Sequence, residues 1–139
     1  MALSRSQLYP NARHLFATKQ LSWLLGNYRF LILGVSYNPN FANKFLTDID
    51  PSQIIATSPA ITNPSETGGL CTGDTVNFGL ITSPLLAGSV ILYQDTGTPA
   101  TSPLIAFFDT PDLPGLPISL NGFVFFLYKN LTAGGWFRL

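Results

Sequence analysis

The sequence is poor in the side chains from which metal and catalytic sites are usually built. It contains one cysteine, Cys71, and one histidine, His14. A lone cysteine excludes a disulfide within the chain, and these two residues alone cannot supply the ligand set of a zinc site. We therefore expect no metal and no cofactor.

Charge is equally scarce. Only 10% of the 139 residues are charged and the formal net charge is zero, whereas a typical soluble domain is about 25% charged. Hydrophobic residues make up 46% of the chain, and the mean hydropathy is +0.28. The longest apolar runs, residues 30–33 and 123–128, have the length of strands, well short of the roughly 20 residues of a membrane span. We expect no membrane segment. Two interpretations stay open, an apolar β-protein or a protein whose surface is covered by its own copies or by a partner.

The few charges are unevenly placed along the chain. Up to Lys44 there are five basic residues and no acid, and from Phe45 onward there are seven acids and two basic residues, so the two parts carry +5 and −5. This split favours head-to-tail contact between copies, or contact with an acidic partner surface. Nucleic acid is a poorer fit, because the basic residues form no Lys/Arg cluster, and we expect no nucleic-acid partner.

No stretch matches a motif that carries chemistry. There is no phosphate-binding GxxxxGK[ST] or GxGxxG loop and no Asp-rich calcium loop. Three acids, Asp95, Asp109 and Asp112, lie near predicted loop ends, where aspartate usually caps or turns the chain. The aromatic residues are spread through the predicted strands, as is typical of core packing. We therefore expect a protein that is not an enzyme.

The clearest structural signal is the stretch 88–109, GSVILYQDTGTPATSPLIAFFD. Its two apolar runs, 89–94 and 104–108, flank a polar segment rich in Thr, Gly and Pro, which predicts an antiparallel strand pair. The near-continuous apolar centre of a strand at 27–36 predicts burial on both faces. In 76–81 the alternation places Val76, Phe78 and Leu80 on one face. Further strands are predicted at 53–57, 123–128 and 136–139, and a helical turn within 41–50. The segment 58–73 is predicted to be mostly loop, with a short strand possible at either end.

One helix is predicted at 11–25, where apolar residues recur at helical spacing between Pro10 and Gly26. Together with roughly seven or eight short strands, this predicts a mainly β fold: an antiparallel β-sandwich or jelly-roll-like domain (27–139) preceded by an N-terminal arm and helix (1–26), in one globular unit. The helix has a broad apolar stripe that must dock on its own sheet or on a neighbouring subunit. The candidate interface residues are Arg5, Arg13, Leu15, Phe16, Lys19 and Trp23.

Several short segments of the sequence resemble a family of small virion proteins of tailed bacteriophages. The most specific are IATSPA at 55–60, YQDTGT at 93–98 and TSPLIA at 101–106. An "F…WL" segment (Phe16, Trp23 and Leu24), the YNPN turn at 37–40, Asn121-Gly122 and the closing FRL at 137–139 match the family pattern as well. The likeness covers nearly the whole chain. The proline-rich segment 111–117 and the segment 65–70 depart from the pattern, which affects expectations about loop contacts more than the expected fold.

The resemblance implies a structural role in the virion, assembled in the host cytoplasm. The expected role is a capsid decoration, or cement, protein whose N-terminal arm and helix reach across neighbouring subunits. Its expected partners are the major capsid protein or other virion proteins, and further copies of itself, with a trimer suggested by the symmetry of a shell. The alternatives are a neck, tail or fibre-adaptor component and, from another class, a carbohydrate-binding module that would use Tyr93, Trp136 and Asn121.

Overall fold

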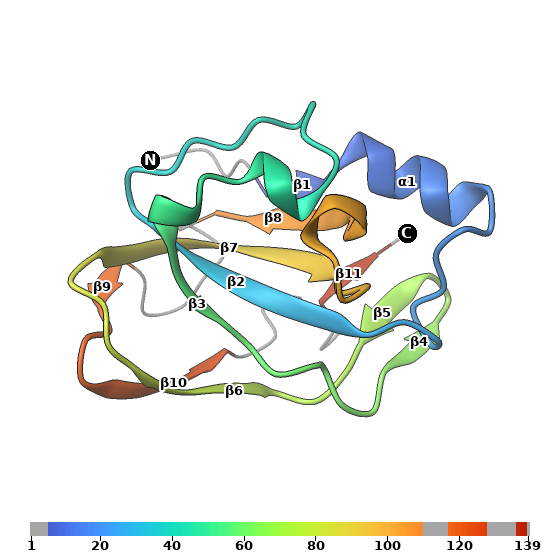
Figure 1. The fold of residues 1–139 in the computed structure, drawn as a ribbon. Coiled ribbons are helices and arrows are strands. Elements are labelled where there is room, and N and C mark those ends of the chain that lie inside the picture. Colours follow the sequence, from blue (N-terminus) through green and yellow to red (C-terminus); the bar gives the residue numbers. More distant parts are fainter. Residues whose placement is uncertain (1–5, 110–116, 128–135, 139) are drawn as a thin grey trace.

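An antiparallel sheet forms the centre of the molecule (Figure 1). The computed structural model describes residues 6–109, 117–127 and 136–138. The strand order is β1 (Gln7–Leu8), β8 (Leu104–Phe108), β7 (Leu86–Gln94), β2 (Tyr28–Gly34) and β3 (Ile54–Thr57), and β9 (Ile118–Ser119) pairs with the start of β7. Strands β7 and β8 pair antiparallel, which confirms the pair predicted from 88–109.

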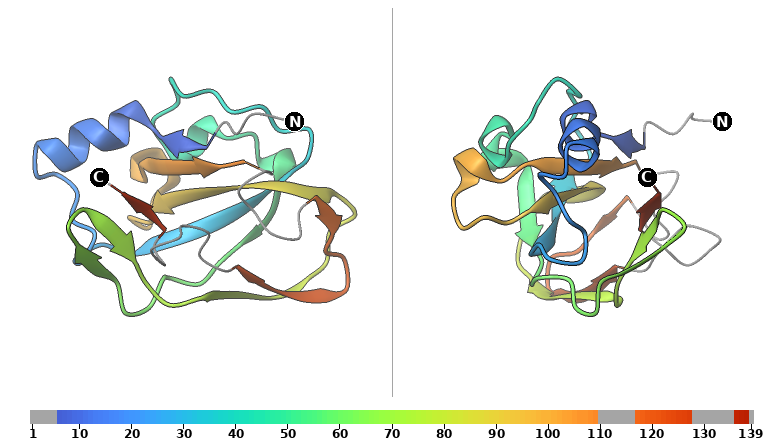
Figure 2. Two further views of the ribbon diagram at one scale, coloured as in Figure 1. Left: turned by 180° about the vertical axis from the view of Figure 1, so that it is seen from behind. Right: turned by 90° about the vertical axis from the view of Figure 1, so that its right-hand side faces the viewer.

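Two smaller antiparallel sheets complete the β-structure. Strand β6 (Val76–Ile81) pairs with β10 (Phe123–Leu127) in a two-stranded ribbon, and β5 (Leu70–Thr72) lies between β4 (Ser65–Thr67) and β11 (Phe137–Arg138). Figure 2 shows both small sheets layered against the central sheet. The predicted mainly β, sandwich-like fold with antiparallel sheets and one α-helix is confirmed for the described residues.

The central sheet is buried on both faces, as the apolar run of β2 predicts. On one face the Phe30 ring lies 4.6 Å from the Trp136 ring and 6.2 Å from the Phe108 ring, measured between centroids. On the other face Phe107 packs against Tyr37 and Phe41. The segment that carries Tyr37 and Phe41 continues into two 3-10 helices, η1 (Leu46–Asp48) and η2 (Pro51–Gln53). A third 3-10 helix, η3 (Pro99–Thr101), lies in the loop between β7 and β8.

The helix is shorter than predicted. Helix α1 spans Pro10–Ala17 rather than 11–25, because Lys19 adopts a left-handed conformation with φ of 63° and the Gln20 amide turns back to donate to the Leu15 carbonyl at 2.8 Å. The chain then forms a non-helical turn before β2. Gly26 lies in this turn and does not cap the helix. The turn requires a glycine at this position, because a Cβ at Gly26 would lie 2.7 Å from the Tyr28 ring.

The predicted facing of Leu80 is wrong, and the cause is a β-bulge. Gly79 has a φ of 74°, and the register with β10 shifts so that Gly79 and Asn77 pair with the consecutive residues Phe125 and Phe126. The Asn77 side-chain oxygen accepts the Gly79 amide at 2.8 Å. The additional residue reverses the alternation, so Ile81 points inward at 2% exposure and Leu80 points outward at 65%.

Candidate interface

The apolar side of α1 docks on its own domain, which answers the question that the sequence left open. Ala12 is fully buried, and the Phe16 ring lies 6.0 Å from the Phe137 ring of β11. Leu15 also packs against the hydrophobic core. Leu15 and Phe16, the apolar interface candidates on α1, are therefore partly buried within the fold, and α1 contacts β8.

Trp23, one of the predicted interface residues, lies in the core of the described fold. Its side chain is 4% exposed, and its ring lies 4.5 Å from the Tyr28 ring and 5.2 Å, edge-on, from the Phe137 ring. Its indole N–H donates to the Thr72 carbonyl at 2.9 Å. Because the Trp23 ring is buried and its N–H is hydrogen-bonded, this side chain has little exposed surface with which to contact a partner.

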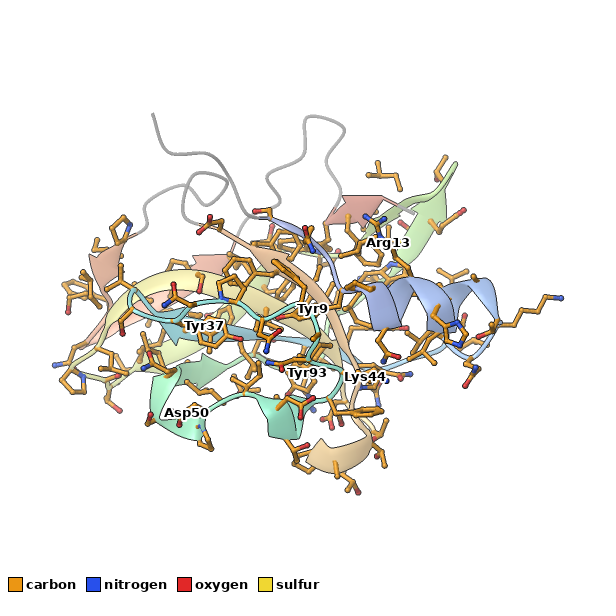
Figure 3. All side chains as sticks on the ribbon, turned by 90° about the horizontal axis from the view of Figure 1, so that it is seen from above. Tyr9, Arg13, Tyr37, Lys44, Asp50 and Tyr93 are labelled. Carbon is orange, nitrogen blue, oxygen red and sulfur yellow. The ribbon has the colours of Figure 1, made fainter. Side chains whose placement is uncertain are left out.

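The solvent-facing side of this region is basic and apolar. Arg13, His14 and Lys19 are exposed, and on the turn after α1 the side chains of Leu24 and Leu25 are 56% and 89% exposed. We call these five residues the helix surface; Figure 3 labels Arg13 on α1. No acid occurs between residues 6 and 44 to neutralise it locally. Arg5, the remaining interface candidate, lies outside the described residues.

One basic residue of the N-terminal part is paired inside the fold. Arg29 on β2 donates from Nε to the Asp95 carboxylate at 2.7 Å and from Nη1 to the Ser58 carbonyl at 3.0 Å. The other oxygen of Asp95 accepts the Gly97 amide at 2.8 Å, which orders the loop after β7. Arg29 and Asp95 thus have a structural role, and the basic interface candidates that remain are Arg13 on α1 and Lys19 just after it.

The described residues offer little for nucleophilic or metal chemistry. Cys71 on β5 is fully buried, and burial, followed by the nearby Glu66 carboxylate, raises the pKa of its thiol to about 11. His14 instead lies exposed on α1. Within the described ranges no group of three or more His, Cys, Asp or Glu side chains could hold a metal ion, and none of the helices described is long and apolar enough to cross a membrane.

The residues expected of a carbohydrate-binding module are not displayed together. Tyr93 and Trp136 are each 4% exposed, and the Trp136 ring packs on Phe30 in the core. Only Asn121, in the turn before β10, is exposed. Sugar binding by stacking needs open aromatic faces, so Tyr93 and Trp136 cannot act as its platform in this structure.

Comparison with known proteins assigns no family to the chain. No protein-family model matches it, and no curated protein sequence is similar to it. The function proposed below therefore depends on the sequence resemblance and on the surfaces of the fold.

Proposed function

We propose that the chain is a non-enzymatic structural protein of a tailed-bacteriophage virion, where it decorates the capsid and stabilises the shell through subunit contacts. The resemblance of several of its sequence segments to small virion proteins supports this role. The proposed partners are the major capsid protein or another virion protein, together with further copies of the chain. The role needs no cofactor, membrane or nucleic acid.

The observation that carries the proposal is the helix surface. Arg13 and Lys19 form no ion pair within the described part of the chain, and Leu25 in the same N-terminal segment is almost fully exposed. An exposed leucine next to unpaired basic residues suits a contact with an acidic, partly apolar protein surface, because the charges orient the contact and the leucines are removed from water. A neighbouring virion subunit would provide such a surface.

Quantitative mass spectrometry of purified particles tests the proposal. A copy number comparable to that of the major capsid protein is expected for a decoration protein. A dozen copies or fewer would move the chain to the neck, tail or fibre adaptor, and we would then look for contacts in the loop 95–102. Absence from particles would contradict every virion role.

Substitutions in the helix surface test the contact itself. Changing Arg13 and Lys19 together to Glu should lower incorporation into particles about tenfold, because each of the two reversed contacts costs up to about 1 kcal/mol and about 1.4 kcal/mol in total is a tenfold change. The matched control is Arg13→Lys with Lys19→Arg, which keeps both charges at the same positions. Equal incorporation of the two double variants would remove Arg13 and Lys19 from the contact.

A further inference from the structure

The ribbon formed by β6 and β10 carries large apolar side chains on both faces, with Asn77 as the exposed polar residue of its outer face, and the described fold covers mainly the inner face. Val76, Ile81 and Leu127 point inward and are at most 5% exposed. Phe123, Val124 and Phe126 of β10 are 63%, 54% and 45% exposed, and Leu80 of β6 is 65% exposed. In the register of the ribbon, Val124 pairs with Leu80 and Phe126 with Asn77, so these side chains share the outer face, whereas Phe123 pairs with the inward-pointing Ile81. We call Leu80, Val124 and Phe126 the ribbon surface. Strand β2, with an equally continuous apolar run, is covered on both faces.

The bulge at Gly79 contributes to this surface. By reversing the alternation in β6, it brings Leu80 out of the core and opposite Val124, its partner in the register with β10. A regular β6 would bury Leu80 with Val76 and Phe78, and a single Gly at positive φ instead places an additional large apolar side chain in solvent. Bulges of this type are built features that re-aim side chains.

The chemistry around the ribbon surface indicates what covers it. No Asp, Glu, Lys, Arg or His occurs between residues 75 and 94 or between 117 and 127, the segments that form the ribbon and flank it in sequence. A nucleic acid or an anionic lipid surface would require basic residues here. The acidic partner that suits the helix surface would likewise find no opposite charge. An uncharged surface, however, meets its own copy without like-charge repulsion.

We propose that the ribbon surface is the contact between two copies of this chain, which pack face to face about a twofold axis. In such an isologous contact the same residues serve both sides, so Leu80 and Val124 of each copy are removed from water by those of its partner. Two sheets packed face to face form an ordinary small sandwich. The neighbouring exposed residues Leu86 of β7 and Ile118 of β9 would extend its rim. The contact leaves the helix surface free, because α1 and the ribbon lie at opposite sides of the molecule in both figures (Figures 1 and 2).

Sedimentation equilibrium of the purified full-length chain over a concentration series tests the pairing without any particle. We expect a reversible dimer. Val124→Lys should raise the dissociation constant at least about tenfold, because two ammonium groups would then meet in an apolar contact. Leu25→Lys is the matched control: it makes the same kind of change at an exposed leucine of the helix surface, and should leave the constant within about twofold.

Three results would overturn the proposal: a wild-type chain that stays monomeric at every concentration, a trimer, or an unchanged dimer in Val124→Lys. Val124→Thr, which keeps the size and the β-branched shape, serves if the lysine variant fails to fold, and it should weaken the dimer severalfold. The result is independent of the virion proposal, since a dimer absent from particles would contradict only the role, and a monomer abundant in particles would contradict only the pairing.

Discussion

At the scale of single residues, Gly79 decides which side chains of β6 face the core. Its φ of 74° lies in the left-handed region, which costs a residue with a Cβ about 1–2 kcal/mol. Gly79→Ala should therefore lower the free energy of unfolding by about that amount, measured by urea denaturation. Gly79→Asn should lose less, because Asn tolerates the left-handed region. An alanine variant as stable as the wild type would show that this backbone conformation is not retained in solution.

Cys71 predicts how stability changes at alkaline pH. Burial raises the pKa of the folded thiol from 9.0 to about 11, so the unfolded chain loses this proton first as the pH rises. The raised pKa of the thiol adds roughly 2–3 kcal/mol to the free energy of unfolding. This contribution is fully present below pH 9 and is lost between about pH 9 and 11. Denaturation of wild type and Cys71→Ala over this range measures it, because burial, the largest cause of the raised pKa of Tyr28, is common to both proteins and the Cys71 thiolate is only the smaller cause. Parallel stability curves for the two proteins would contradict the buried thiol.

At the scale of elements, patterns of residues predicted the longer strands but not the irregular positions. The bounds of β6 and β8 agree with their predictions, because each run has strong alternation or strong apolar character between turn residues. Two-residue strands such as β1 and β9 are too short to carry a periodic signal. The hairpin of β4 and β5 fell in a segment expected to be mostly loop, since its strands are three residues each.

The candidate interface was predictable only in part, for a related reason. Helical spacing placed Phe16 and Trp23 on one helix, whereas α1 ends at Ala17 and Trp23 lies in the turn that follows, although both rings contact Phe137. Spacing also cannot tell whether an apolar set packs on its own sheet or on a neighbour. The end of α1 at Ala17 was hidden as well, because Lys19, the left-handed residue that follows it, is not a glycine. The exposure of Leu80 depends on Gly79, whose role as a bulge appears only when β10 is paired beside it.

The turn after α1 gives a direct test of which residues hold this element in place. Trp23→Ala should destabilise the fold by about 3–5 kcal/mol, because it removes a ring packed on Tyr28 and Phe137 and leaves the Thr72 carbonyl without the indole donor. Leu25→Ala, two residues away on the same turn, should change stability by less than about 0.5 kcal/mol because its side chain is 89% exposed. Chemical denaturation measures both. Similar losses in the two variants would place Trp23 outside the core.

At the scale of the whole molecule, the two exposed surfaces differ in chemistry and should respond differently to salt. The helix surface relies on Arg13 and Lys19, and the ribbon surface has no charge. Raising the ionic strength from about 0.15 M to 1 M shortens the Debye length from about 8 Å to about 3 Å, which weakens contacts between exposed charges and leaves apolar contacts intact. We expect co-sedimentation of the chain with undecorated particles to fall as salt rises, while the dimer measured by sedimentation equilibrium over the same series stays constant or tightens. Dissociation of the dimer by salt would mean that charges outside the ribbon hold the copies together, and particle binding indifferent to salt would mean that Leu24 and Leu25, rather than the basic residues, make the virion contact.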